Sequence, residues 1–210
     1  MLESKDFYFF GYSGHALVVI DVAFANGFHV KGYYDKVKNK SALSDINFMG
    51  DESIKEEVRF DKNAVFFPAI GENTTRKSIV ELIEKLELNQ ISLIHPSAVV
   101  SSSATYGLST LIGANSVVNS SAVLGQGCIV NSGALVEHEC RIGNFVHLAP
   151  GAVLAGDVMV GNNAFIGAGA VIKQGVKIGA NAIVGAGSIV LRDIPRGETW
   201  VGNPAKRMKR

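Results

Sequence analysis

The chain has 210 residues, 47% of them hydrophobic, and its 20 lysines and arginines offset 19 aspartates and glutamates to leave a formal net charge of +1. This balance argues against a nucleic-acid-binding surface as the main role. No apolar run approaches the ~18 residues that a membrane span requires. The acidic N-terminal segment MLESKDFYFF has no cleavage pattern, so we do not expect a signal peptide. The two cysteines, Cys128 and Cys140, indicate reduced thiols in a cytoplasmic protein.

The first 93 residues alternate apolar strands with helical segments. Such alternation indicates a small, Rossmann-like parallel α/β domain over residues 1–93. Pro96 marks its end, because proline interrupts strand pairing. The predicted elements are a strand, a glycine-rich turn and an amphipathic helix over residues 7–28, a second strand over residues 30–35, a third strand over residues 64–71 and a second helix over residues 72–88.

A six-residue repeat then runs without interruption from Ile94 to Pro195, which makes 17 hexads. The first position is a branched aliphatic residue in every hexad except the one that begins with Tyr106. The fifth position is nearly always small, and glycine often takes the second. A strict period of six cannot keep one face of a 3.6-residue helix apolar, so a helical interpretation fails.

The repeat therefore predicts short strands joined by tight corners, with one bulky and one small side chain per hexad pointing inward. Gly or Asn is expected to supply the corner conformations with positive φ. The pattern resembles the hexapeptide-repeat acyltransferases, which fold as a left-handed triangular parallel β-helix. On this resemblance three hexads form one coil, so the repeat gives between five and six coils. The β-helix domain, with a C-terminal closing tail, is assigned to residues 94–210.

A glycine-rich turn containing Gly11, Ser13, Gly14 and His15 follows the first predicted strand and opens a helix. Backbone N–H groups and a helix N-terminus at such a turn can face an anion such as a diphosphate. Asp35, at the tip of the second strand, is placed to accept hydrogen bonds from the base or ribose of a nucleotide. The full dinucleotide fingerprint is not met. A tight strand–helix turn without a ligand is the alternative.

His138 lies between Glu137 and Glu139, at the third position of its hexad. The core positions are the first and fifth, so His138 is expected to face outward near a corner. An outward histidine between carboxylates could act as a general base with a fixed tautomer. The alternative is a solvated histidine on a charged edge. A zinc site with Cys140 and His147 is disfavoured, because Cys140 occupies an inward position.

The segment from Trp200 to Arg207 follows the last coil. Its Gly-Asn-Pro-Ala-Lys run is similar to the closing loop of many CoA-using members of the superfamily. Lys206 and Arg207 could meet the phosphates of CoA. The alternative is a solubilising basic terminus, to which Lys209 and Arg210 also belong.

Together these features resemble the PglD-like nucleotide-sugar N-acetyltransferases of bacterial glycan pathways, including bacillosamine synthesis, and the related sialic acid O-acetyltransferases. The resemblance spans essentially the whole chain and includes the stretch from Ala69 to Arg76. It implies an α/β domain that binds a sugar nucleotide and a β-helix that binds acetyl-CoA. It also implies a homotrimer whose active site lies between neighbouring β-helices.

The resemblance further assigns roles to individual residues. His138 would be the general base, Glu139 would raise its basicity and hold its orientation, and Asn131 would help to place the acceptor. The residues implied to contact acetyl-CoA are His147, close to the thioester, together with Ala168, Ala186 and Lys206. The residues implied to bind the nucleotide sugar are Gly11, Ser13, Gly14, His15, Asp35, Lys36, Gly71, Asn73 and Asn131.

These assignments imply direct, metal-free acetyl transfer to the 4-amino group of a nucleotide-linked 4-amino-4,6-dideoxy sugar, with UDP favoured. No cysteine or serine stands beside a base, which disfavours a covalent intermediate. The choice among UDP, GDP and dTDP stays open at this point, as does N- against O-acetylation. The competing functions are a hexapeptide carbonic anhydrase, which needs three zinc-binding histidines, and a non-catalytic β-helix scaffold.

Overall fold

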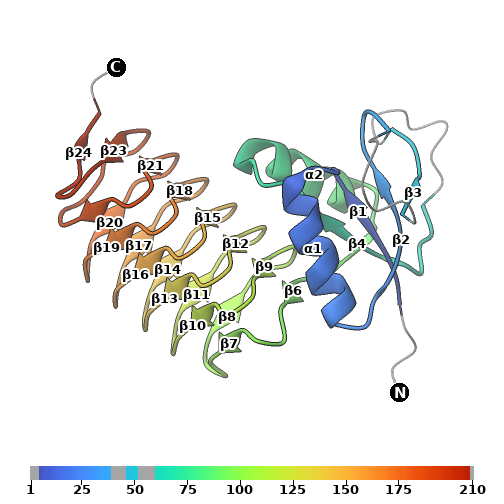
Figure 1. Cartoon of the computed structure of the whole chain (residues 1–210), viewed down its shortest axis with the longest axis horizontal. Coiled ribbons are helices and arrows are strands. Elements are labelled where there is room, and N and C mark those ends of the chain that lie inside the picture. The colour runs from blue at the N-terminus through green and yellow to red at the C-terminus, as the bar shows by residue number, and fades with distance from the viewer. Residues whose placement is uncertain (1–4, 39–45, 52–59, 209–210) are drawn as a thin grey trace.

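The computed structural model describes residues 5–38, 46–51 and 60–208; Lys209 and Arg210 of the basic terminus lie outside this range. Figure 1 shows a sheet with two helices at one end of a long coil of short strands. Within the described residues, no helix combines the length and the apolar character needed to cross a membrane.

The N-terminal sheet has five parallel strands in the order β3-β2-β1-β4-β5. Its strands are β1 (Asp6–Phe10), β2 (His29–Tyr34), β3 (Asn47–Phe48), β4 (Val65–Pro68) and β5 (Asn89–Gln90). The three predicted strands are confirmed as β1, β2 and β4. The edge strands β3 and β5 were not predicted, because two residues are too short to carry a periodic pattern.

Two helices cover opposite faces of this sheet, as the Rossmann-like interpretation predicts. α1 (Gly14–Ala25) shares a buried cluster with Phe7 and Phe9, whereas Phe10 belongs to the cluster of α2 (Asn73–Lys85). Both helices directly follow a strand or its turn, so their N-termini lie at the carboxyl edge of the sheet. Ligands of open parallel sheets bind at that edge.

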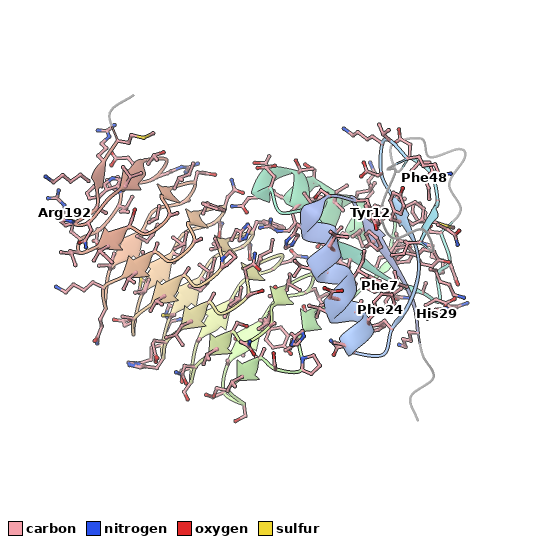
Figure 2. The ribbon with its side chains drawn as sticks, viewed as in Figure 1. Phe7, Tyr12, Phe24, His29, Phe48 and Arg192 are labelled. Carbon is pink, nitrogen blue, oxygen red and sulfur yellow. The ribbon has the colours of Figure 1, made fainter. Side chains whose placement is uncertain are left out.

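The helix α1 is not amphipathic, contrary to the prediction. Val19 and Ile20 are fully buried, but Leu17 and Phe24 on the other side are 43% and 55% exposed. Figure 2 shows Phe24 at the outer surface of the helix. The buried side of α1 packs against two layers, the sheet and the β-helix, whereas Leu17 and Phe24 are covered by neither.

The repeat folds as a parallel β-helix of 17 two-residue strands. Each strand pairs with the strand 18 residues further on, as Val117 pairs with Leu135 and Leu135 with Val153. One coil is therefore three hexads, as predicted. The strands are β6 (Leu93–Ile94), β7 (Val99–Val100), β8 (Thr105–Tyr106), β9 (Leu111–Ile112), β10 (Val117–Val118), β11 (Val123–Leu124), β12 (Ile129–Val130), β13 (Leu135–Val136), β14 (Arg141–Ile142), β15 (His147–Leu148), β16 (Val153–Leu154), β17 (Met159–Val160), β18 (Phe165–Ile166), β19 (Val171–Ile172), β20 (Lys177–Ile178), β21 (Ile183–Val184) and β22 (Ile189–Val190).

Three sheets form the sides of this coil. We call them sheet I (β6, β9, β12, β15, β18, β21), sheet II (β7, β10, β13, β16, β19, β22) and sheet III (β8, β11, β14, β17, β20). The chain passes from sheet I to sheet II to sheet III in every coil, so three rows of corners run along the β-helix.

The interior of the β-helix is filled by the first and fifth positions of the hexads. First-position side chains from Ile112 to Val190 are all 4% exposed or less. Cys128 and Cys140, both at fifth positions, are buried free thiols. Ile94 and Val100, in the first coil, are only partly buried, and Tyr106 is 41% exposed. Its strand β8 is the first of sheet III, so no preceding coil covers it.

The corners place positive φ at the fourth position of the hexad rather than at the glycine-rich second position. Asn115 and Glu139, both fourth-position residues, have φ of 56° and 62°. The glycines at second positions serve a different purpose. A Cβ on Gly161 would lie 2.4 Å from the backbone nitrogen of Ala180 in the next coil. Glycine is needed there for close stacking of coils. The expectation that Gly or Asn supplies the corner conformations is confirmed at fourth positions such as Gly133 and Asn163.

The C-terminal segment closes the far end of the β-helix. β23 (Thr199–Val201) extends sheet I, and β24 (Lys206–Arg207) pairs with it in antiparallel fashion. The indole of Trp200 is only 7% exposed and covers the end of the core. The guanidinium of Arg192 lies 5.1 Å from the centroid of this ring, at the end of the molecule opposite the α/β domain (Figure 2).

Candidate active site

The outer face of sheet I joins the β-helix to the α/β domain. Leu93, Leu111 and Ile129, on successive strands, are buried in the same cluster as the inner side of α1. The next two strands place His147 and Phe165 at the equivalent positions. The apolar stripe therefore changes to a histidine where the covered part of sheet I ends.

A cleft of about 380 Å³ opens beside this point, between the start of α2 and sheet I. Residues 71–74 form one wall, and Asn163, Phe165, Asn181 and Ile183 form the other. The carboxylate of Glu72 accepts hydrogen bonds from the backbone N–H groups of Thr74 and Thr75, at 2.9 and 2.7 Å. The positive end of α2 is thus occupied by its own capping residue rather than left open for an anion.

Arg76 lies between the two domains and is only 1% exposed. Its Nε donates to the carbonyl of Gly127 at 2.7 Å, and its two terminal nitrogens each make two further hydrogen bonds. The acceptors of those four bonds are the carbonyls of Ile70, Gly71 and Phe145 and the side-chain oxygen of Asn73. Burial lowers the pKa of Arg76 to about 10, which still leaves the guanidinium protonated at neutral pH.

His147 sits at the edge of this interface, 9% exposed. Its Nδ1 lies 3.1 Å from the carbonyl oxygen of Gly71, and its Nε2 lies 3.4 Å from the amide nitrogen of Asn131. A carbonyl only accepts, so Nδ1 carries the proton and donates. Burial, followed by the nearby charge of Arg76, lowers the pKa of His147 to about 4. The ring is therefore a neutral imidazole whose Nε2 is an acceptor.

The glycine-rich turn is held by hydrogen bonds to β2. Gly11 adopts φ +84° and donates its N–H to the carbonyl of Tyr34 at 2.8 Å. The N–H of Tyr12 donates to a carboxylate oxygen of Asp35, also at 2.8 Å. Ser13 begins α1 in an extended conformation without a side-chain cap, and the first turn of α1 contains no acidic residue. The N-terminus of α1, unlike that of α2, thus keeps its positive end open.

His15 brings this turn close to His147, with the two ring centroids 6.1 Å apart. Burial, followed by the proximity of His147, lowers its pKa to about 4, and its buried Nε2 has no hydrogen-bond partner among the described residues. The structure thus gathers five of the predicted residues: His15, Gly71, Asn73, Asn131 and His147.

The remaining residues predicted to bind the nucleotide sugar lie at the rim of this group. Ser13, Gly14 and Lys36 are exposed, and Asp35 is half-buried through its contact with the turn. They lie at the carboxyl ends of β1 and β2, beside the open N-terminus of α1. A ligand bound there would extend along the domain surface toward His15.

His138 faces outward, as predicted, from the corner between sheets II and III. Its Nδ1 lies 3.1 Å from a carboxylate oxygen of Glu139, and the two side chains are 51% and 67% exposed. This hydrogen bond directs the other ring nitrogen, Nε2, away from Glu139. The imidazole lies against Gly156 in the next coil, where a Cβ would come within 2.5 Å of the ring. The ring is therefore held on one side by a carboxylate and on its face by a glycine.

The predicted contacts to acetyl-CoA lie on a different row of corners. Ala168 and Ala186 are exposed residues between sheets I and II, one coil apart, whereas His138 lies between sheets II and III. Lys206 is exposed on β24 at the end of the β-helix. Within one chain, then, the candidate base and the candidate acetyl-CoA contacts do not share a corner.

The three side chains considered as zinc ligands lie in different environments. Cys140 is buried in the prism, His138 is exposed at a corner, and His147 lies on the outer face of sheet I. The parts of the chain that the structure describes hold no group of three or more His, Cys, Asp or Glu side chains suited to a metal ion.

No functional role for Arg76 or Gly156 was predicted from the sequence. Arg76 precedes Ile79, Val80 and Ile83, the buried apolar residues of α2, at helical spacing. A cation on the apolar side of an amphipathic helix is a detectable anomaly. For Gly156, however, the sequence offers no signal, since glycine is frequent throughout the repeat.

Separate family models match the α/β domain and the β-helix of this chain. Residues 6–83 match the model described as the PglD N-terminal domain. Residues 107–138 match the hexapeptide repeat of succinyl-transferase, and residues 139–174 and 157–192 match the bacterial transferase hexapeptide of six repeats.

Three individual proteins are similar to this chain. UDP-N-acetylbacillosamine N-acetyltransferase of Bacillus subtilis strain 168 is 41% identical over 63 residues, which cover 30% of this chain and 29% of that protein. The acetyltransferase domain of PglB from Neisseria gonorrhoeae FA1090, in complex with acetyl coenzyme A, is 33% identical with a TM-score of 0.91. That match covers 98% of this chain and 100% of the other. A histidine-to-alanine variant of GDP-perosamine N-acetyltransferase from Caulobacter crescentus, in complex with CoA and GDP-perosamine, is 34% identical with a TM-score of 0.90 over 100% and 99% of the two chains.

Proposed function

The chain belongs to the PglD-like hexapeptide-repeat acetyltransferases, and on this premise we propose that it acetylates the 4-amino group of a UDP-linked 4-amino-4,6-dideoxy sugar. The observation that carries the proposal is the similarity over nearly the whole chain to acetyltransferases that bind acetyl-CoA, or CoA with a nucleotide-linked amino sugar. The exposed His138–Glu139 pair supports it, because acetyl transfer to an amine needs an accessible base.

We assign the nucleotide sugar to the α/β domain, residues 1–93, and acetyl-CoA to the β-helix domain, residues 94–210. The open N-terminus of α1 suits a diphosphate, and the half-buried Asp35 and the exposed Lys36 suit the nucleoside. The choice of UDP follows the Bacillus relative, whereas the Caulobacter relative binds a GDP-linked sugar. A cytoplasmic location, inferred from the two free thiols, stays a prediction.

In the proposed reaction the sugar amine, in its neutral form, attacks the thioester carbonyl of acetyl-CoA. His138 Nε2 takes the proton that the amine loses as the C–N bond forms, while the Nδ1–Glu139 hydrogen bond stabilises the resulting imidazolium. The tetrahedral intermediate collapses with cleavage of the C–S bond, and the CoA thiolate leaves and is protonated. No covalent acetyl-enzyme is needed.

We further propose that the active enzyme is a homotrimer. His138 and the residues assigned to acetyl-CoA occupy different corners of one chain, so a complete site needs His138 from a neighbouring copy. The outer face of sheet II offers the contact surface. It carries an unbroken apolar row, one residue from each strand: Val99, Val117, Leu135, Val153, Val171 and Ile189. An apolar row of this length on a sheet face favours burial against another subunit.

Gly156 gives a specific test of how His138 is held. Gly156→Ala would place a Cβ about where the imidazole now lies, so the ring must turn away from its position beside Glu139. We expect kcat to fall roughly 10- to 100-fold, with an unchanged KM for the nucleotide sugar. Steady-state kinetics check this. A folded Gly156→Ala variant with wild-type kcat would show that acetyl transfer does not need the ring in this position.

The substrate is tested by mixing the purified protein with acetyl-CoA and a panel of acceptors while free thiol release is followed. The panel contains UDP-, GDP- and dTDP-linked 4-amino sugars, and free sialic acid as the O-acetyl acceptor. We expect strongest turnover with the UDP-linked 4-amino sugar.

Each alternative predicts a different outcome. Turnover mainly with a GDP- or dTDP-linked amino sugar would contradict the choice of nucleotide and leave N-acetylation standing. Turnover with sialic acid alone would make the protein an O-acetyltransferase. An inactive protein that also fails to bind acetyl-CoA in calorimetry would favour a scaffold role.

A further inference from the structure

The guanidinium of Arg76 uses all five of its N–H groups between the two domains. Resting on the function proposed above, we propose that Arg76 is a positioning residue for acetyl transfer. It fixes the α/β domain on the β-helix and, through the carbonyl of Gly71, holds His147 in one orientation and one tautomer.

The acceptors of Arg76 come from both sides of the interface. Gly127 and Phe145 contribute corner carbonyls of two successive coils, at 2.7 and 3.1 Å. Ile70 and Gly71 contribute the loop between β4 and α2, at 3.1 and 2.9 Å. One planar side chain therefore fixes the spacing between the loop and the β-helix, and the rigid fork of arginine suits this better than a lysine ammonium.

Asn73 strengthens the same joint. Its side-chain oxygen accepts from Arg76 at 2.8 Å, while its amide nitrogen donates to the backbone carbonyls of Asn163 and Ala164, at 3.2 and 3.1 Å. Arg76 and Asn73 together thus bind the start of α2 to three successive coils. These hydrogen bonds hold the carbonyls of Ile70 and Gly71, in the loop between β4 and α2, in a fixed position on the β-helix.

The carbonyl of Gly71 connects this joint to the site. It accepts from Arg76 and, at 3.1 Å, from Nδ1 of His147. A carbonyl oxygen has no proton to donate, so its position beside Nδ1 selects the Nδ1–H form of His147 and leaves Nε2 as an acceptor. Asn131 then donates to Nε2 across 3.4 Å, a long contact that a ligand N–H could replace.

A purely structural role does not account for a guanidinium at this position. The five hydrogen-bond acceptors of Arg76 are all neutral oxygens, and the carboxylate of Glu72 acts on its charge without accepting one of these bonds. Apolar residues of similar volume often stabilise a buried site as well as or better than an ion does. We attribute the guanidinium to the carbonyl groups that it orients. Of these, the carbonyl of Gly71 also accepts a hydrogen bond from the imidazole of His147.

The test measures the tautomer of His147 directly. Histidine-selective ¹⁵N labelling and long-range ¹H–¹⁵N spectra distinguish Nδ1–H from Nε2–H, and His147→Gln identifies the His147 signals. We expect wild-type His147 to be Nδ1–H at pH 7, and Arg76→Met to give a mixture of both tautomers. We also expect Arg76→Met to lower kcat/KM for acetyl-CoA roughly 10- to 100-fold, with partial recovery in Arg76→Lys.

The matched control is Gln126→Ala, which removes another hydrogen bond between the same domains, to Glu84, without touching Gly71. We expect it to leave the tautomer and the kinetics unchanged. If Arg76→Met does not fold, Arg76→Lys takes its place in both measurements. The proposal is overturned if wild-type His147 is Nε2–H, or if the folded Arg76 variant keeps pure Nδ1–H. These spectra need no substrate, so they decide the proposal even if the protein acetylates none of the panel.

Discussion

Replacing His138 with alanine is expected to lower kcat for acetyl transfer by about two to four orders of magnitude, the usual range for loss of a general base. The amine must lose a proton as it attacks the thioester, and His138 is an exposed imidazole of the β-helix whose Nδ1 is already bonded to a carboxylate. The fold should persist, because the side chain is half exposed and contributes little to the core. Thiol release under saturating substrates measures the effect.

The matched control for this variant is His29→Ala. His29 is an exposed histidine that also lies beside a carboxylate, 3.4 Å from Asp6, but it stands on β2 far from the β-helix corners. We expect it to retain wild-type kcat. If His138→Ala kept more than about a tenth of wild-type kcat, another group would be the base, since even modest general-base catalysis contributes about 100-fold.

The β-helix could be predicted from the sequence in nearly all respects, because its rule is local. An aliphatic residue such as Val118 or Ile166 recurs every six positions, and each one is buried as the period requires. The α/β domain was predicted less completely. The strands β3 and β5 contain two residues each and depend on pairing with β2 and β4, which no local pattern records.

Two features of the repeat that its local pattern did not predict have the same physical origin. The six-residue pattern offered no reason for glycine at the second position, where the adjacent coil requires it, as at Gly161. Tyr106 was expected inside, but its strand lacks a neighbour below. Both outcomes are set by residues 18 positions away or by their absence, and a six-residue pattern does not contain that information.

In the candidate site, too, features set by local sequence could be predicted and features set by distant residues could not. The outward orientation of His138 followed from its position in the hexad and is confirmed by its 51% exposure. The environment of Arg76 could not be predicted, because the carbonyls that it binds belong to Gly127 and Phe145, 51 and 69 residues further along the chain. The sequence shows the anomaly of a cation on an apolar helix face, but only the fold identifies its partners.

The second large effect is expected from a charge on the outer face of sheet II. Val153 lies in the middle of the apolar row, with Leu135 and Val171 on the adjacent strands. In the proposed trimer, Val153→Glu would bury a carboxylate without a partner, which costs several kcal/mol at each copy of the interface. We expect the variant to elute as a monomer and to lose essentially all turnover. Light scattering should give the chain mass of 22.3 kDa in place of three times that mass.

Met159→Glu separates this effect from a general intolerance of charge on the β-helix. Met159 is an apolar residue at the matching outward position of sheet III, but Arg141 and Lys177 flank it on the adjacent strands. A face that already carries these charges is suited to solvent, so the control should remain trimeric and active. In the proposed trimer, assembly joins His138 of one copy to the corner assigned to acetyl-CoA on another. A folded Val153→Glu monomer with wild-type turnover would therefore mean that one chain holds the whole site, and that the separation of His138 from Ala168 and Ala186 must close by a change within the chain.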